Sequence, residues 1–222
     1  MPNEESEYEN RAAERLIFFS DAVVAIAITL LAIDLPVPSG ATVADFWSSA
    51  REHDGVYLSF LVSFVTIAAA WSHHHDALKY VRRTDARLRN LTMIWLLMIV
   101  LIPFATKLLT GYEHHAVGVH ALRWGFYALL QTVAAGALLA IGRHLASRGL
   151  EAEHAAGRAV DRTDWQSYGA MLGFGLSIPV FFVTAYGWVL WIAAPMLTGQ
   201  VERLRRRRGA VGSDGRDGAA DL

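Results

Sequence analysis

Apolar residues gather into runs of about 20 along the chain, and short segments between these runs hold most of the charges. A helix needs roughly 20 apolar residues to cross about 30 Å of hydrocarbon, so each run predicts a membrane-spanning helix. The first four predicted spans are residues 16–35, 56–71, 91–109 and 122–141. The first stops at Pro36 and Pro38, the third contains Pro103, and an extension of the second through His75 is left open.

The last apolar stretch, residues 165–197, is too long for one crossing and barely long enough for two. Pro179 and Gly187 offer turning points within it. We therefore expect two short helices joined by a tight turn, which makes six spans in all. Five spans is the alternative.

The basic residues distinguish these two topologies, because cytoplasmic connections are enriched in Lys and Arg. Two connections and the segment after the last span are rich in them: Lys79, Arg82, Arg83, Arg87 and Arg89; Arg143, Arg148, Arg158 and Arg162; and Arg203 with Arg205 to Arg208. With six spans and both termini cytoplasmic, all three clusters face the same side. With five spans the last cluster would face outward, so the charges favour six.

Composition agrees with a membrane protein, since 54% of residues are hydrophobic and 18% are charged, against about a quarter charged in soluble domains. The chain has no cysteine, which excludes disulfides and thiolate metal sites. Its acidic N-terminus is unlike a secretory signal. We expect a cytoplasmic segment at 1–13, a six-helix domain at 14–204, and a basic, then disordered, cytoplasmic tail at 205–222. The lipid bilayer is an expected partner and nucleic acid is not.

The first predicted span, RLIFFSDAVVAIAITLLAIDLP, carries two distinct faces. At about 100° per residue, one stripe holds aliphatic side chains, with Thr29 at its edge, while Ser20 and Asp21 point roughly 120–140° away from Ile26. The stripe consists of Arg15, Phe19, Ala22, Ile26, Leu30 and Ile33. Ionisable groups inside a span are costly and normally face a partner in the bundle. Capping or snorkelling at the cytoplasmic end is the simpler reading of Arg15 and Asp21.

Candidate partners for these polar groups occur at the same predicted level of the membrane. Trp71 and three consecutive histidines, 73–75, end the second span, and Asp85 and Asn90 precede the third. A buried carboxylate needs hydrogen-bond donors, and indole, imidazole and amide groups supply them. We therefore predict a polar cluster that joins the first three spans.

These residues resemble the bacterial members of the transmembrane protein 175 family, whose animal relative is an endosomal and lysosomal potassium channel. The similarity lies in the motif R-x-x-x-F-S-D of Arg15, Phe19, Ser20 and Asp21, and in the later Trp71, His74, His75, Asp85 and Asn90. It is specific over residues 15–90. Beyond them it rests on hydropathy and length alone.

The resemblance implies an all-α homotetramer of six-helix subunits in the bacterial cell membrane, with the first helix lining a central potassium pore. It makes Ile26 the main constriction, Leu30 and Ile33 outer layers, and Thr29 a ring of hydroxyls. It assigns the remaining motif residues to a structural packing network: Arg15, Phe19, Ser20, Asp21, Trp71, His74, His75, Asp85 and Asn90. No cofactor, resident metal or enzymatic activity is expected.

A leak-type channel with weak to moderate potassium selectivity is the leading interpretation, because the chain has no TVGYG-type filter and no voltage-sensing arginine series. The alternative is a proton-coupled transporter that uses His73 to His75 with Asp21, since histidine titrates near neutral pH. A metal site at these histidines is disfavoured, because adjacent helical residues point about 100° apart. His114, His115 and His120 are expected in a solvated loop.

Overall fold

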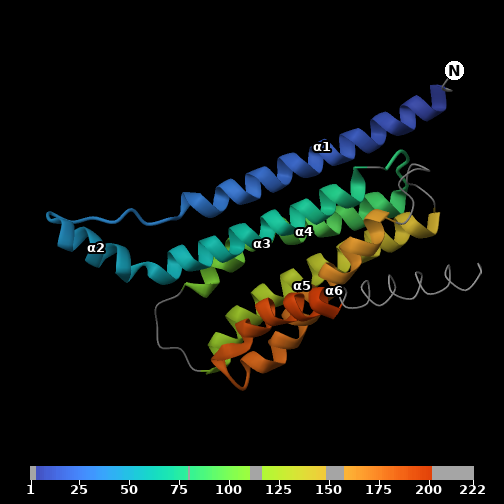
Figure 1. The fold of residues 1–222 in the computed structure, drawn as a ribbon. Helices are drawn as coiled ribbons and strands as arrows, with labels where there is room; N and C mark the ends of the chain where they lie inside the picture. The colour runs from blue at the N-terminus through green and yellow to red at the C-terminus, as the bar shows by residue number, and fades with distance from the viewer. Residues whose placement is uncertain (1–3, 80, 111–116, 149–157, 202–222) are drawn as a thin grey trace, which may run out of the picture.

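The computed structural model describes residues 4–79, 81–110, 117–148 and 158–201, and its elements are helices packed side by side (Figure 1). The labelled elements are α1 (Glu4–Ile33), α2 (Val43–Glu52), α3 (Asp54–Leu78), α4 (Ala86–Leu109), α5 (Val117–Arg148), α6 (Arg158–Phe181) and the 3-10 helix η1 (Ala185–Trp188). A further helix covers residues 189–201. Successive long helices run in opposite directions, and the predicted tail, 205–222, lies outside the described residues.

Four helices are long and apolar enough to cross a membrane: Tyr8–Ile33, Asp54–Leu78, Ala86–Leu109 and Gly118–Arg148. They confirm the first four predicted runs as helices of sufficient length and hydropathy. The first ends at Ile33 rather than at Leu35, because the residue before a proline is disfavoured in helical conformation. The apolar part of α6, Ser167–Phe181, is shorter than the other four.

Basic residues collect at one end of the bundle. The start of α1, the connection from α3 to α4, the end of α5 and the start of α6 all lie there (Figure 1). Arg83 of the connection makes a 2.8 Å ion pair with Glu9 of α1, from Nε to Oε2. At the opposite end, Lys107 Nζ lies 2.7 Å from Asp34 Oδ2 and joins α4 to the exit of α1.

The final apolar stretch forms a helical hairpin, and its turn lies between the two turning points that the sequence offered, Pro179 and Gly187. Pro179 is inside α6, and the turn follows at residues 182–184, before η1. A proline is tolerated in an apolar helix when neighbours satisfy the freed backbone groups. Trp191 of the last helix donates through Nε1 to Ser177 Oγ at 2.8 Å and fastens the two arms together.

Two glycines let the arms of this hairpin approach closely. A Cβ added at Gly173 would lie 2.6 Å from the carbonyl oxygen of Leu190 and 3.0 Å from Cβ of Ala194. Gly169 similarly faces Pro195, at 3.0 Å from its Cα. Small residues four apart are the usual way for helices to pack closely in membranes.

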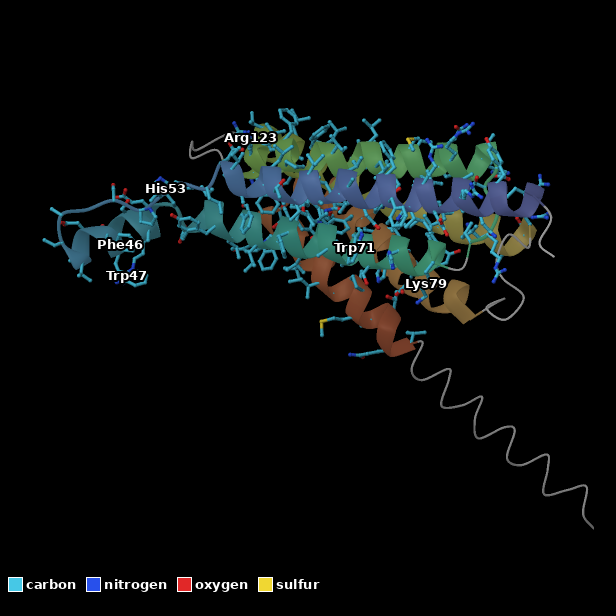
Figure 2. The ribbon with its side chains drawn as sticks, turned by 90° about the horizontal axis from the view of Figure 1, so that it is seen from above. Phe46, Trp47, His53, Trp71, Lys79 and Arg123 are labelled. Atoms are coloured by element: carbon cyan, nitrogen blue, oxygen red, sulfur yellow. The ribbon has the colours of Figure 1, made fainter. Side chains whose placement is uncertain are left out.

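The sequence interpretation missed α2, a ten-residue helix in the connection after α1. Its start follows from local chemistry: the Thr42 hydroxyl accepts from the Asp45 amide, and the Asp45 carboxylate accepts from the Thr42 amide. Figure 2 shows α2 at one end of the molecule, where it carries the exposed Phe46 and Trp47.

His120 does not lie in a loop, contrary to the sequence prediction. It belongs to α5 and stacks on Trp124, with ring centroids 5.4 Å apart, and it also contacts Phe181 edge-on. The helix begins at Val117, several residues before the predicted apolar run, because helices continue beyond the hydrocarbon into polar sequence. His114 and His115 lie outside the described residues.

Candidate functional site

Helix α1 lies at the margin of the bundle and packs against α3 and α4 (Figure 1). Val24, Ala27 and Leu31 form its buried face, with no more than 6% of each side chain exposed. They contact the main apolar core, which includes Trp95 and Ile99 of α4. Their three- and four-residue spacing places them on one helical face, so one side of α1 is fixed against its own subunit.

The opposite face of α1 is an uncovered aliphatic stripe centred on Ile26. Ile26 is 59% exposed, Leu30 42% and Ile33 76%. Thr29 is also exposed, and its hydroxyl donates to the Ile26 carbonyl at 2.8 Å. Contacts within the subunit therefore leave free the face that the sequence interpretation assigned to the pore.

The polar side of α1 is joined to α3 through Asp21. Trp71 donates from Nε1 to Asp21 Oδ1 at 2.8 Å, and the ring of His75 lies 5.5 Å from the indole of Trp71. Trp71 sits on α3 near the middle of the bundle, on the side towards Lys79 (Figure 2). The structure thus brings together three residues of the predicted cluster: Asp21, Trp71 and His75.

His74 lies in a separate contact between α3 and α4. Its imidazole is 1% exposed and stacks parallel on the indole of Trp95, with centroids 4.0 Å apart and ring planes 2° apart. Ser20 is equally buried, but its hydroxyl donates to the Leu16 carbonyl of its own helix at 2.8 Å. A bond of this kind satisfies the serine without a partner from another helix.

Asp85 forms a third contact, which joins α4 to α5. It caps α4 by accepting from the Leu88 amide at 2.7 Å, and its other oxygen lies 2.7 Å from His144 Nε2. The amide of Leu88 holds the pKa of the Asp85 carboxyl below its ordinary value, and His144 and the charge of Arg148 add to that effect against a smaller opposing cost of burial. His144 was not among the predicted residues.

The predicted network is therefore three separate contacts rather than one cluster. Arg15, Phe19 and Asn90 are exposed and lie outside these contacts. Trp95 and His144 went unnoticed in the sequence because each stands alone within a helical run. Across the described ranges 4–79, 81–110, 117–148 and 158–201, no group of His, Asp and Glu side chains is arranged to hold a metal ion.

A second buried polar group joins α3, α4 and α5 and was also missed. Thr106 donates to Ser63 at 2.8 Å, Ser63 and Tyr127 share a hydrogen bond at 3.2 Å, and Gln131 donates to the Tyr127 hydroxyl at 3.1 Å. All four side chains are buried. Single polar residues such as these form no motif in a sequence. In an apolar bundle, however, they need hydrogen-bond partners, and they are each other's partners here.

The apolar helices and their alternating directions define a multi-pass, all-helical membrane protein. Residues 15–103 match the family described as the endosomal/lysosomal potassium channel TMEM175. A potassium channel of Streptomyces collinus is 31% identical over 172 residues, or 77% of this chain and 83% of that protein. The chain belongs to the TMEM175 family.

A relative and a solved structure from Chamaesiphon minutus extend the comparison. A potassium channel of this organism is 37% identical over 109 residues, which are 48% of this chain and 54% of that relative. The crystal structure of a lysosomal potassium-selective channel TMEM175 homologue from Chamaesiphon minutus aligns with a TM-score of 0.66 and 26% identity. That alignment covers 88% of this chain and 98% of the other, so the likeness extends beyond residues 15–103 to nearly the whole fold.

Proposed function

We propose that this protein is the subunit of a potassium-conducting channel whose pore is lined by α1. The observation that carries the proposal is the uncovered aliphatic stripe of Ile26, Leu30 and Ile33, on a helix whose other face is fixed in the core. Its relatives from Streptomyces collinus and Chamaesiphon minutus are described as potassium channels, which supports the same function here.

Ile26 forms the main constriction in this proposal, with Leu30 and Ile33 as outer layers and Thr29 as a ring of hydroxyls. A ring of aliphatic side chains gates by dewetting and makes an ion shed part of its water. Potassium releases water more readily than sodium does, so the ring favours potassium. Selectivity is weak to moderate, because no cage of carbonyls replaces the lost water, and conduction is of the leak type.

The proposed assembly is a homotetramer in which four copies of α1 surround the ion path. Residues 158–181 and 189–201 serve as the fifth and sixth spans, and both termini face the cytoplasm of a bacterial cell. The three contacts of Asp21 with Trp71, His74 with Trp95 and Asp85 with His144 are structural, since they hold α1, α3, α4 and α5 in register. In this proposal Ser20 belongs to the structural set through its hydrogen bond to Leu16 within α1. The exposed Arg15, Phe19 and Asn90 complete the set through contacts between subunits.

The proton-coupled transporter is the weaker candidate. Asp21 accepts its hydrogen bond from an indole, which does not titrate, and His74 is enclosed in a stack with Trp95. Neither arrangement forms a continuous path for a proton between these two residues. Unitary current steps in single-channel recordings distinguish a pore from a transporter, which produces none.

The proposal is tested by ion flux from liposomes that contain the purified protein. We expect potassium gradients to drive cation movement without any coupled ion, and sodium gradients to drive less. Empty liposomes and liposomes with an unrelated helical membrane protein are the controls. Absence of potassium flux from correctly folded, tetrameric protein would refute the channel.

A further inference from the structure

A cavity of about 410 Å³ lies between α5 and α6, near the start of α4. Its polar lining residues are Arg87, Arg143, His144, Ser147 and Tyr168. They come from three helices. Arg87 is in the first turn of α4 and Arg143 is near the end of α5. These two helix ends lie at the end of the bundle where the basic residues collect (Figure 1). The proposed pore and its stripe on α1 use none of the lining residues.

Positive charge dominates the polar part of this cavity. Within the described part of the chain, neither Arg87 nor Arg143 has a carboxylate partner. The carboxylate of Asp85 is already held by the Leu88 amide and by His144. Two arginines in one cavity, neither paired with a carboxylate of the described residues, favour an anionic ligand, because a guanidinium binds phosphate through paired N–H donors.

Arg143 is held in place for such a role. Its guanidinium carbon lies 5.3 Å from the ring centroid of Tyr168, and one of its terminal nitrogens donates to the Tyr168 hydroxyl. A guanidinium has five N–H donors, so this bond leaves most of them for a ligand. Stacking on an aromatic ring orients the group and lowers the entropy lost when it binds an anion.

The remaining lining of the cavity is apolar and extends deeper into the bundle. Gly136, Leu139 and Ala140 of α5 and Met171 of α6 line it. On α5 the lining residues run from Ser147 at the basic end to Gly136, which is about 16 Å at 1.5 Å per residue. The cavity therefore changes from cationic to apolar along the direction in which a phospholipid changes from headgroup to acyl chain.

We propose that this cavity binds an anionic phospholipid of the cytoplasmic leaflet. The phosphate lies between Arg87 and Arg143, with Ser147 as an additional donor, and one acyl chain follows Leu139, Ala140 and Met171. A free phosphate ion would use the arginines but would leave the apolar wall uncovered. The gradient along α5 therefore favours the lipid, and basic pockets between helices on the cytoplasmic side bind such headgroups.

The test is native mass spectrometry of the purified full-length protein, titrated with phosphatidylglycerol and with phosphatidylcholine of the same acyl chains. We expect preferential binding of phosphatidylglycerol. A double variant, Arg87→Gln with Arg143→Gln, should weaken that binding by about 25-fold, since each charge contributes about 1 kcal/mol near an anionic lipid. The matched control is Arg82→Gln with Arg89→Gln, two exposed arginines at the same end that do not line the cavity.

A second variant, Ala140→Phe, keeps every charge and fills the apolar part of the cavity. It should weaken phosphatidylglycerol binding while the oligomeric state on size-exclusion chromatography stays unchanged. Equal losses in the control pair, or equal affinity for the two lipids, would overturn the proposal. A parallel titration uses inorganic phosphate. Binding of inorganic phosphate as tight as that of phosphatidylglycerol would overturn the assignment to a lipid.

Discussion

The indole of Trp71 donates a hydrogen bond to the carboxylate of Asp21 at 2.8 Å, and this bond fixes how α1 is rotated about its own axis. Asp21 and Ile26 point about 140° apart on a helix. While Asp21 faces α3, the Ile26 stripe is therefore turned away from the subunit's own core. The proposed pore surface depends on a contact that lies on the other side of the same helix.

Asp21→Ala and Trp71→Phe should each destabilise the assembled protein, because each leaves one partner of a charge-assisted hydrogen bond unpaired. A double-mutant cycle should give a coupling energy of about 1–2 kcal/mol, reduced from the value for a fully buried bond because Trp71 is 38% exposed. Thermal stability of the detergent-solubilised protein, followed by size-exclusion fluorescence, provides the measurement. Trp47→Phe on α2 is the matched control, since Trp47 is also exposed, and it should have little effect. Additive effects of the two substitutions would show that the hydrogen bond contributes nothing to the stability of the protein.

Ile26→Asn should change the ratio of potassium to sodium permeability, because a ring of polar amides replaces the ring of aliphatic side chains at the proposed constriction. We expect larger conductance and lower selectivity, measured as reversal potentials under bi-ionic conditions. Ile94→Asn on α4 is the matched control: Ile94 is another exposed isoleucine, at 46%, but it lies on a different helix. An unchanged permeability ratio in the Ile26 variant, with the channel still conducting, would remove Ile26 from the constriction.

Helix positions could be predicted from the sequence better than helix lengths. The apolar runs defined four spans, because the hydrocarbon thickness fixes how many apolar residues a crossing needs. Hydropathy predicts only the part of a helix that lies in the hydrocarbon. It therefore did not predict that α5 begins at Val117 and continues to Arg148. It also missed α2, whose start depends on the local capping pair of Thr42 and Asp45 rather than on a long apolar run.

The candidate site could be predicted only in part. Placing Asp21 and Trp71 at the same depth was enough to bring them together, because both helices are straight crossings with a known rise per residue. The depth of a residue in the membrane does not predict which neighbouring helix its side chain contacts. Asp85 consequently contacts His144 of α5, a helix that the sequence argument had left out, and His74 meets Trp95.

Protein stability should fall at low pH partly through Asp85. The Leu88 amide and His144 lower the pKa of its carboxyl from the ordinary 3.8. A depressed folded-state pKa stabilises the protein above the unfolded-state value, and this contribution is lost as the pH falls from about 4 through the lowered pKa. In Asp85→Asn the loss of melting temperature between about pH 5 and pH 3 should be smaller than in the wild type.

Asp85→Asn and Asp85→Ala together separate the charge from the helix cap. Asparagine still accepts from the Leu88 amide as an N-cap residue, whereas alanine does not, so Asp85→Ala should cost about 1 kcal/mol more at neutral pH. Thermal unfolding at both pH values supplies the comparison. Identical pH profiles for the wild type and Asp85→Asn would contradict a role for this carboxylate in acid sensitivity.

The close approach of the last helix to α6 can be tested at a single glycine. Gly173→Ala would put a methyl group 2.6 Å from the Leu190 carbonyl oxygen, so the hairpin must open or shift. Overpacking of this kind costs about 1–3 kcal/mol, which should appear as a lower melting temperature and faster proteolysis of the last helix. Gly175→Ala is the matched control, because its methyl group would meet Thr132 Cγ2 at 3.5 Å, an ordinary contact, and its stability should stay near the wild type. Equal stability of both variants would mean that residues 189–201 do not pack against Gly173 in the membrane, and the proposed sixth span would then need a different partner.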